Sequence, residues 1–464
     1  MIRIQDDEVG SSGLDLEMIR KYSIPGPRYT SYPPATKFNA SLEGLEDGIT
    51  ADNRDERQPL SLYFHLPFCQ SLCWYCGCHT VITRDHSLSS KYVDDLANEV
   101  VLTALRIRRN RQVSQIHFGG GTPTFLAPND LRRLGRIIKD QFELGPNLEF
   151  GVEIDPRTLT DEHVAALAEI GANRASLGVQ DTNPKVQLAI HRWQPQTLNQ
   201  RAMSALRTAG IRSVNVDLIF GLPEQTVSSF ATTIDDVLAL GPDRLSVFSY
   251  AHVPWLKPAQ KIFDRNGCLP TAEEKLAMFA MAHCKLKAAG YIDIGLDHFA
   301  RPGDELAIAQ SKGTLHRNFQ GYSTAADASL YGFGVSSISS TTRTYRQNFK
   351  AMDAWRSALE SHKLPIERGL VLNPDDERRR AIIMRIMCSR KLDFAAASSE
   401  LGVDVTSAFS VEIAGLRDLE DDGIVARTPT GFSVTAKGAP LLRVIAMRFD
   451  ATFVSLDGQH SQTV

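Results

Sequence analysis

From about residue 60 to residue 250, the sequence alternates short runs of β-branched and aromatic residues with longer amphipathic segments. The short runs favour strands, and the longer segments have the apolar spacing of helices. A helix that crosses back over a sheet makes the two strands that it connects parallel. The alternation therefore predicts an α/β fold, a (β/α)6 partial barrel. We expect strands over 61–66, 115–118, 148–154, 174–179, 213–220 and 244–250, and helices over 91–109, 129–142, 161–170, 197–209 and 226–240.

Polar or glycine-rich groups follow the carboxyl ends of these predicted strands. In parallel α/β barrels, the loops at that end converge on one mouth and carry the active site. The sequence therefore predicts one shared functional cavity. In chain order the groups are Cys69, the run 119–123, Glu153 with Asp155, Gln180 with Asp181, Asp217 with the run 221–223, and the run 250–252.

Two regions of different character flank the predicted barrel and its extension, which we place at 59–368. The N-terminal extension, 1–58, contains the proline-rich run 24–34, whose prolines disfavour a helix and favour an extended path that lines the site. Residues 369–464 are expected to form a mostly helical, winged-helix-like domain. We expect helices there over 375–389, 395–401, 407–421 and 439–449, and a hairpin that turns at 429–431.

Charge and hydropathy limit the kinds of partner. The chain has 51 Lys and Arg against 54 Asp and Glu, a net charge of -3, so no overall basic field attracts nucleic acid or an anionic membrane. It has neither a basic-then-apolar N-terminal signal nor an uninterrupted run of about 18 apolar residues. We therefore expect a cytoplasmic monomer without membrane insertion or nucleic-acid binding. Acidic residues at 418 and 420–422 precede the hairpin, so the C-terminal domain is expected to serve packing or partner contact.

The 7 cysteines are unevenly distributed, because four of them lie between Cys69 and Cys78. Their CxxxCxxC spacing, in a chain expected to be cytosolic, points to a metal rather than to disulfides. Three close thiolates suit tetrahedral zinc, completed by Cys78 or His79, and they suit an iron–sulfur cluster equally well. Spacing alone leaves these two alternatives open.

The motif resembles that of the radical S-adenosylmethionine (SAM) enzymes, in which CxxxCxxC follows the first barrel strand. This resemblance implies a 4Fe-4S cluster held by Cys69, Cys73 and Cys76, with a fourth iron open to SAM; Cys78 receives no ligand role. The run Gly119-Gly120-Gly121-Thr122 resembles the GGE-like step of the superfamily, which receives the methionyl amino group. Threonine replaces the glutamate of that step, and a carboxylate follows one strand later at Glu153.

Further segments resemble more narrowly the oxygen-independent coproporphyrinogen III oxidase family. The resemblance implies oxidative decarboxylation of coproporphyrinogen III to protoporphyrinogen IX in haem biosynthesis. A 5′-deoxyadenosyl radical, generated from SAM at the cluster, would take a hydrogen from each reacting propionate. The segments are Tyr63-Phe64-His65-Leu66-Pro67-Phe68-Cys69, Cys76-Gly77-Cys78, the run 25–33, Asp297-His298-Phe299-Ala300-Arg301-Pro302 and His316-Arg317-Asn318-Phe319-Gln320-Gly321-Tyr322.

Site residues are carried over from this family by matching segments. The first SAM site corresponds to Tyr63, Gly120, Glu153 and Ile338. A second SAM site corresponds to Tyr75, Gly121, Thr122, Gln180, Arg192, Asp217 and Ala251. Because the substrate carries four propionates, a local cluster of cations is required, and Arg28, Arg301 and Arg317 are the candidates. No side chain is assigned catalysis beyond the cluster and SAM.

Two alternatives compete with this enzyme. One is a haem chaperone of the same fold, against which the run 25–33 argues because the chaperone branch generally lacks it. The other is a winged-helix regulatory protein stabilised by a structural zinc, against which the glycine triplet and the polar strand ends argue. The electron donor and the electron acceptor of the enzyme are not identified by the sequence.

Overall fold

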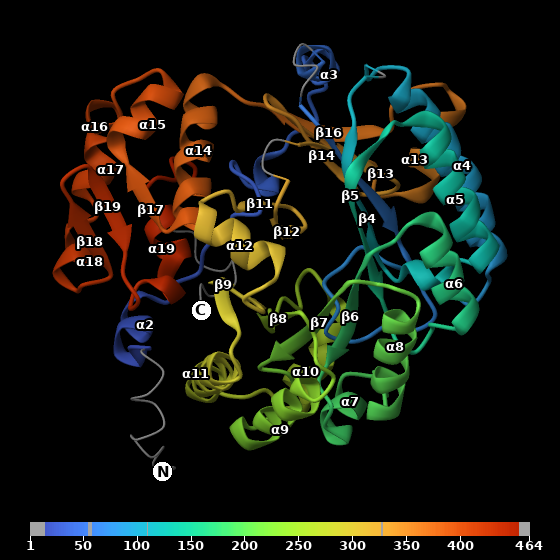
Figure 1. The fold of residues 1–464 in the computed structure, drawn as a ribbon, viewed down its shortest axis with the longest axis horizontal. Coiled ribbons are helices and arrows are strands. Elements are labelled where there is room, and N and C mark those ends of the chain that lie inside the picture. Colours follow the sequence, from blue (N-terminus) through green and yellow to red (C-terminus); the bar gives the residue numbers. More distant parts are fainter. Residues whose placement is uncertain (1–13, 54–57, 109, 326–327, 454–464) are drawn as a thin grey trace.

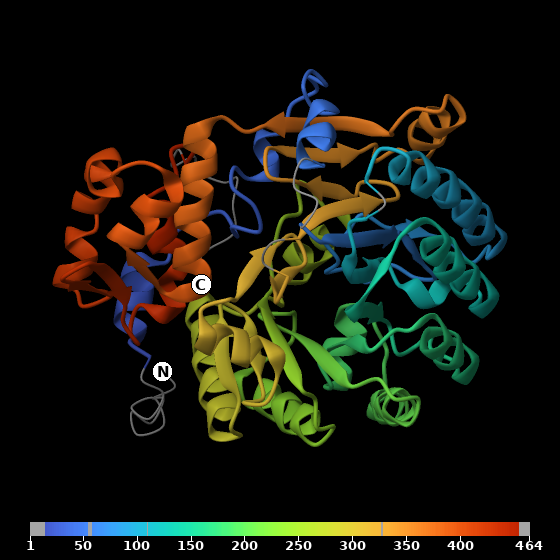
Figure 2. The ribbon, with the colours of Figure 1, turned by 45° about the horizontal axis from the view of Figure 1, so that its top comes forward.

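A twelve-stranded sheet forms the centre of the molecule in the computed structural model, which describes residues 14–53, 58–108, 110–325 and 328–453 (Figures 1 and 2). The strand order is β16-β15-β14-β13-β1-β4-β5-β6-β7-β8-β10-β9. All six predicted strands are present, and they pair in parallel as neighbours. They are β1 (Leu60–Leu66), β4 (Val113–Gly120), β5 (Leu144–Ile154), β6 (Arg174–Gln180), β7 (Ser213–Phe220) and β8 (Arg244–Ser249).

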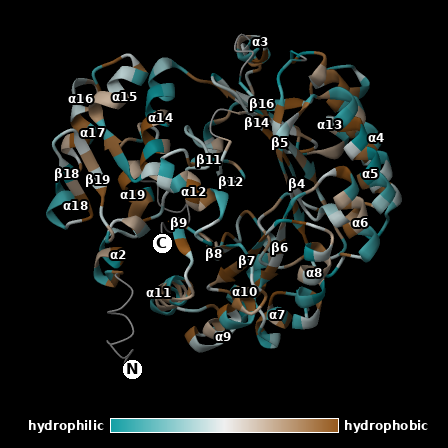
Figure 3. Ribbon diagram, in the orientation of Figure 1, coloured by the Kyte–Doolittle hydropathy of each residue, from teal (hydrophilic) through white to brown (hydrophobic). Residues whose placement is uncertain are grey.

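The five predicted crossover helices cover the outside of this sheet. Their apolar faces pack on strand residues such as Phe64, Phe118 and Val216 in one continuous core. Hydrophilic and hydrophobic positions alternate along them (Figure 3). They are α4 (Ser87–Ala104), α5 (Pro128–Gln141), α6 (Asp161–Ile170), α8 (Gln196–Thr208) and α9 (Val227–Leu238). The helix expected over 91–109 ends at Ala104 instead, and residue 109 lies outside the described residues.

Local sequence explains where two of these helices begin. The Thr160 hydroxyl accepts a hydrogen bond from the backbone N–H of His163, and Thr226 does the same for Ser229. In both cases the third residue also reaches back to the cap, so that two backbone N–H groups are satisfied at once. Gly171 ends α6 with a φ of 97°, a conformation that suits glycine.

The sheet extends well beyond the six predicted strands. At one edge, β13 (Ser329–Phe333) pairs in parallel with β1, and antiparallel strands follow it; at the other edge, β10 pairs antiparallel with β8. The sequence analysis missed these short strands. They are β14 (Ile338–Ser340), β15 (Thr344–Asn348), β16 (Ile366–Val371), β9 (Ile292–Gly295) and β10 (His298–Ala300), with two separate pairs, β2 (Phe68–Cys69) with β3 (Val81–Ile82) and β11 (His316–Asn318) with β12 (Gly321–Ser323).

Further helices lie in the connections and in the N-terminal extension. Within the described residues, no helix is both long enough and apolar enough to span a bilayer. The α-helices are α2 (Leu16–Tyr22), α3 (Asp47–Asp52), α7 (Pro184–Ala189), α10 (Lys261–Asn266), α11 (Ala272–Ala288), α12 (Glu305–Lys312) and α13 (Met352–Glu360), and the 3-10 turns are Ala35–Lys37, Pro123–Phe125 and Pro258–Gln260.

The C-terminal domain is mostly helical, as predicted, and it lies beside the barrel (Figure 1). The single helix expected over 407–421 is wrong: three short helices replace it, with a break at Phe409 (φ -120°, ψ 28°). The helix expected over 439–449 begins as a 3-10 turn. The elements are α14 (Pro374–Ser389), β17 (Lys391–Asp393), α15 (Phe394–Leu401), α16 (Val405–Ala408), α17 (Ser410–Ala414), α18 (Arg417–Asp421), β18 (Val425–Thr428), β19 (Gly431–Val434), the turn Ala439–Leu441 and α19 (Leu442–Met447).

The N-terminal extension connects this domain to the barrel. Its proline-rich run forms no helix, as expected, but the path is not fully extended, because it bends over 30–33 and Tyr29 has a φ of 47°. The Tyr29 hydroxyl donates to Asp450 Oδ2 at 2.9 Å, and Arg443 Nε donates to the Pro27 carbonyl at 2.9 Å. On the other side, the Tyr345 hydroxyl of β15 donates to the Tyr32 carbonyl at 3.0 Å. The boundary expected between residues 368 and 369 falls inside β16, which continues to Val371.

Candidate active site

The cysteine motif occupies the loop between β2 and β3, directly after β1. Cys73 is buried, Cys69 and Cys76 are half-buried, and Cys78 is exposed. Burial raises the pKa of the Cys69 thiol to about 12, whereas a hydrogen bond with Cys78 lowers the pKa of Cys76 to about 6. Among the described residues, no three His, Cys, Asp or Glu side chains are grouped so as to hold one metal ion.

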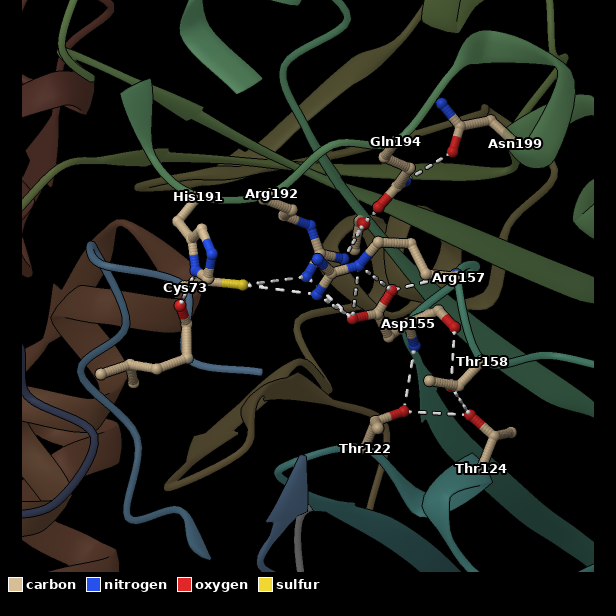
Figure 4. A network of polar contacts seen from close by, with 12 residues as sticks. Cys73, Thr122, Thr124, Asp155, Arg157, Thr158, His191, Arg192, Gln194 and Asn199 are labelled. Atoms are coloured by element: carbon tan, nitrogen blue, oxygen red, sulfur yellow. Dashed lines mark hydrogen bonds and ion pairs between the residues drawn. The ribbon is translucent and has the colours of Figure 1, made fainter. Parts of the chain in front are cut away.

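Cations from two neighbouring units face the buried thiol (Figure 4). Arg192 Nη1 lies 3.4 Å from Cys73 Sγ, and Arg157 Nη2 lies 3.5 Å from it. Both guanidiniums also contact Asp155 Oδ2, at 3.0 and 2.6 Å. Burial alone would raise the pKa of Asp155, but the two arginines lower it to about 2. This end of the barrel therefore holds fixed positive charge beside the cysteines, which stabilises an anionic group bound there.

Backbone geometry explains the glycine triplet at the end of β4. A Cβ on Gly119 would lie 2.9 Å from the Glu153 carboxylate, and one on Gly121 would lie 2.5 Å from the Phe68 carbonyl oxygen. Gly120 has a φ of 115°, which a residue with a side chain rarely adopts. Its N–H donates to Glu153 Oε2 at 3.1 Å. The triplet therefore brings β4 against the cysteine loop and leaves a cradle of backbone beside the thiols.

Glu153 and Tyr63 point into the barrel from neighbouring strands. Glu153 Oε1 lies 3.2 Å from His117 Nε2, yet 43% of its side chain is accessible, so a ligand can still reach it. His65 Nε2 lies 2.9 Å from the His79 carbonyl, which can only accept, so Nε2 carries the proton. His65 Nδ1 then accepts from the Tyr63 hydroxyl at 3.0 Å. Burial lowers the pKa of His65 to about 4, which keeps this imidazole neutral.

Ile338 completes the first predicted SAM group. It begins β14, and a Cβ on Gly332 would lie 2.7 Å from its carbonyl oxygen. Gly332 in turn pairs with Tyr63 across β13 and β1. The structure thus brings Tyr63, Gly120, Glu153 and Ile338 to one side of the cysteine loop.

The residues of the second predicted SAM group surround the same mouth from β5 to β8. Thr122 Oγ1 accepts from the Asp155 N–H at 3.1 Å, and Arg192 Nη2 donates to the Gly178 carbonyl at 2.6 Å. Gln180 ends β6 with a φ of 70°. Tyr75 packs with the cluster that includes Tyr250, next to Ala251. These residues and Gly121 all lie around the carboxyl ends of the strands.

Asp217 of β7 is the carboxylate of this group, and its pKa is shifted. Ser176 Oγ donates to its Oδ2 at 2.7 Å, and Asn215 Nδ2 donates to its Oδ1 at 2.7 Å. Burial nevertheless raises its pKa from 3.8 to about 6. Asp217 therefore changes charge near neutral pH, at the point where a ligand would meet it.

The structure brings two of the three candidate arginines together. Arg28 and Arg317 line a cavity of about 310 Å³ beside Ala251, and this cavity is also lined by Lys275, Arg443 and Asp297. Arg317 is 5% exposed, and its Nε and Nη1 have no hydrogen-bond partner among the described residues. A buried guanidinium with unpaired N–H groups favours an anionic ligand.

Arg301 does not line this cavity, although it shares a second, larger groove with Arg317. Its Nε donates to the Pro242 carbonyl at 2.9 Å, and its guanidinium lies 5.6 Å from the centre of the Tyr291 ring. Pro242 precedes β8, so this contact is at the amino end of the barrel. A groove of about 2410 Å³ opens there, and Arg301 lines it. The geometry gives Arg301 a structural contact away from the cysteines.

Sequence reasoning missed several residues of the site. Asp155 was noted as a strand end but not assigned, and Arg157, His117 and Lys275 were not considered. The Asp155-Pro156-Arg157 run directly after β5 carried a usable signal, because it follows the same strand-end pattern as the assigned residues. Lys275 carried none, since it is one of the three lysines of helix α11.

Two family models match the chain. The Radical SAM superfamily matches residues 63–237, and the HemN C-terminal domain matches residues 372–441. An oxygen-independent coproporphyrinogen III oxidase of Pseudomonas aeruginosa is 43% identical over 454 residues, covering 97% of this chain and 98% of its own length. The chain belongs to the oxygen-independent coproporphyrinogen III oxidase family. The Escherichia coli relative of that name is 41% identical over 437 residues, covering 94% of this chain and 95% of its own length.

A solved structure agrees with this family. It is described as "Coproporphyrinogen III oxidase (HemN) from Escherichia coli is a Radical SAM enzyme", and it matches with a TM-score of 0.90, 38% identity, and coverage of 95% of this chain and 99% of that one. Membership implies a 4Fe-4S cluster and SAM as cofactors. The site fits them: three thiols follow β1, guanidiniums face Cys73, and the glycine cradle leaves backbone accessible. Membership of this family excludes the alternative of a winged-helix regulatory protein stabilised by a structural zinc.

Proposed function

We propose that this chain catalyses the oxygen-independent oxidative decarboxylation of coproporphyrinogen III to protoporphyrinogen IX in haem biosynthesis. The observation that carries the proposal is identity of about 40% over nearly the whole chain to proteins of that activity, together with the matching fold. The relatives that match over nearly the whole chain are named as oxidases, which disfavours the alternative of a haem chaperone of the same fold.

The cofactors would be held at the carboxyl mouth of the barrel. Cys69, Cys73 and Cys76 would ligate the cluster, and Cys78 would act on Cys76 through their hydrogen bond. When bound, the cluster and SAM supply a carbon radical that removes hydrogen from the substrate. The chain's part is to bind, orient and enclose. The barrel wall excludes water and unrelated C–H bonds from that radical.

Two SAM molecules per active site are part of this proposal. The first would contact Tyr63, Gly120, Glu153 and Ile338, where a backbone N–H, a carboxylate and a phenol suit a zwitterionic amino acid and a ribose. The second would lie across the mouth. Its contacts would be Tyr75, Gly121, Thr122, Gln180, Arg192, Asp217 and Ala251. The position of both groups around one cysteine loop supports the assignment.

Substrate carboxylates would bind in the cavity lined by Arg28 and Arg317. The chain is acidic overall, but Lys275 and Arg443 join these arginines around one half-buried carboxylate, Asp297. The buried N–H groups of Arg317 gain partners when a propionate enters. Arg301, at the other end of the barrel, is not part of this cavity.

The remaining expectations concern location and partners. We propose a cytoplasmic monomer that binds no nucleic acid and exchanges electrons with a donor and an acceptor. The acidic segment before the hairpin supports the expectation that the C-terminal domain binds no nucleic acid. Its carboxylates are used in ion pairs within the chain: Asp422 pairs with Lys21 of α2, and Asp418 pairs with Arg448. The segment is thus used in packing the N-terminal extension. The domains we propose are those expected from the sequence, 1–58, 59–368 and 369–464, with the last boundary moved to the end of β16 at Val371.

An anaerobic assay tests the proposed reaction. Reconstituted protein, SAM, a reductant and coproporphyrinogen III are incubated, and porphyrin products and methionine are separated by chromatography. We expect divinyl product together with methionine. An intact cluster that cleaves SAM but leaves coproporphyrinogen III unchanged, with each of several electron acceptors, would contradict the proposal.

A further inference from the structure

Two loops beside the cysteine loop expose large apolar side chains. In the segment 184–193, Leu188 is 65% and Trp193 is 53% exposed. In the segment 253–261, Trp255 is 58% and Leu256 is 67% exposed. Tryptophan is enriched at the centres of protein interfaces, and gathered apolar side chains on a surface mark interaction sites. The SAM and substrate assignments use none of these four residues.

The first of these segments contacts the cysteine loop directly. The Trp74 N–H donates to the Ile190 carbonyl at 3.1 Å, and His191 Nδ1 donates to the Leu72 carbonyl at 2.9 Å. The Trp74 ring also stacks on His191, with 5.1 Å between ring centres. Leu188 and Trp193 therefore lie next to the part of the loop that carries Cys73.

The second segment contacts the other end of the cysteine loop. Lys257 Nζ donates to the Cys78 carbonyl at 2.8 Å, and Gln260 Nε2 donates to the Tyr75 carbonyl at 3.1 Å. Trp255 and Leu256 precede these two anchoring residues. The two segments thus contact the cysteine loop at both ends, and their exposed side chains lie beside it.

Charge distinguishes this surface from the rest of the chain. Neither 184–193 nor 253–261 contains an Asp or Glu, although the whole chain has a net charge of -3. The two segments contribute Lys185, Lys257 and Lys261, of which Lys185 and Lys261 are exposed. A basic edge around an apolar centre steers an acidic partner and then holds it by apolar contact.

We propose that this surface docks an acidic one-electron carrier protein that reduces the cluster. We name it the tryptophan rim: Leu188, Trp193, Trp255 and Leu256, with Lys185 and Lys261. One electron passes from the carrier to the cluster, so the carrier is oxidised by one electron and no atom moves. This proposal rests on the proposed function in one respect: the cluster held by the cysteine loop must be reduced.

Binding is measured first, because it does not depend on turnover. A flavodoxin, which is an acidic protein that carries one electron on its flavin, serves as the probe and is titrated with the enzyme at low salt. We expect Trp255→Ser and the pair Lys185→Glu/Lys261→Glu each to weaken the Kd by about tenfold or more. The charge pair should also flatten the salt dependence of binding. Matched controls outside the tryptophan rim are Val411→Ser, at a residue 80% exposed, and the exposed pair Lys312→Glu/Lys391→Glu.

The choice of reductant distinguishes a loss of carrier docking from a loss of SAM cleavage itself. Cleavage of SAM is followed with reduced flavodoxin and, separately, with dithionite, which needs no docking surface. We expect the rim variants to lose flavodoxin-driven cleavage and to retain dithionite-driven cleavage within about twofold. Unchanged flavodoxin binding, equal loss with both reductants, equal loss in the controls, or binding to anionic vesicles in place of flavodoxin would overturn the rim. Absence of dithionite-driven cleavage in the unmodified enzyme would contradict the proposed function instead.

Discussion

The two mouths of the barrel use polar residues in opposite ways. At the amino end, Glu149 is paired through both oxygens: Gln115 Nε2 donates to one at 2.7 Å, and Arg174 Nε lies 2.9 Å from the other. At the carboxyl end, Asp217 accepts only from neutral groups, and 43% of the Glu153 side chain remains accessible. The amino mouth is thus held by interactions within the protein, whereas the carboxyl mouth keeps capacity for ligands.

The pKa shifts of one buried carboxyl group from each mouth, Glu149 and Asp217, have opposite signs. Burial would raise the pKa of Glu149, but Arg174 and its neighbours hold it below its ordinary value. Burial does raise the pKa of Asp217, the nearby Glu153 carboxylate raises it further, and the hydrogen bonds that it accepts from neutral groups do not offset this. Burial therefore has opposite net effects on Glu149 and Asp217, depending on whether the protein supplies a counter-charge. A buried polar group without such compensation is a better indicator of a ligand site than burial alone.

The largest effect is expected at the cysteine loop of the carboxyl mouth. Cys73→Ser removes a cluster ligand, so the visible absorbance of the cluster and SAM cleavage should fall by roughly 100-fold or more, beyond the usual loss from an outer-shell partner. Iron and labile sulfide are measured together with methionine release. Cys268→Ser, which lies outside the motif, is the matched control. Full retention of iron in Cys73→Ser would remove Cys73 from the ligand set.

The next effect compares arginines from the two mouths. Arg28→Ala should raise the apparent KM for coproporphyrinogen III by about tenfold, because a charged hydrogen bond to a carboxylate is lost. SAM cleavage without substrate should stay unchanged. Arg301→Ala should change neither quantity by more than about twofold, since Arg301 contacts the Pro242 carbonyl at the amino end. Equal increases in KM for Arg28→Ala and Arg301→Ala would contradict the assignment of the substrate carboxylates to the cavity that Arg28 lines.

How far the sequence predicts this molecule depends on the range of the interactions involved. The six barrel strands and their helices follow from local periodicity, and β7 and α6 have the predicted bounds. Strands β13 to β16 are short and are set by pairing with distant segments, as where Leu60 meets Ser329, so local patterns do not reveal them. The site divides in the same way. Strand-end residues such as Glu153 were found, whereas the separation of Arg301 from Arg28 depends on tertiary placement.

A pH titration tests the carboxyl mouth. The folded protein binds the Asp217 proton more tightly than the unfolded chain does, so Asp217 lowers stability as pH rises from about 4 to 6. Asp217→Asn should remove that slope in urea unfolding. Ionised Asp217 accepts hydrogen bonds, so SAM affinity of the unmodified protein should rise by about tenfold from pH 5 to pH 7. The affinity of Asp217→Asn should stay flat; an equal rise in both would assign the pH effect to another group.

The smallest effect on catalysis is expected at the amino mouth, where stability should respond instead. Glu149→Gln keeps the shape but removes the charge paired with Arg174, and should cost about 1–3 kcal/mol of unfolding free energy at pH 7. Because folding lowers the pKa of Glu149, its contribution is present at neutral pH and is lost as pH falls through that pKa. The difference between Glu149→Gln and the unmodified protein should therefore shrink in acid, opposite in sign to the Asp217 slope. The ratio kcat/KM should stay within about twofold, measured beside urea unfolding. A large loss of kcat/KM with unchanged stability would place ligand binding at the amino mouth and break the division between the two ends.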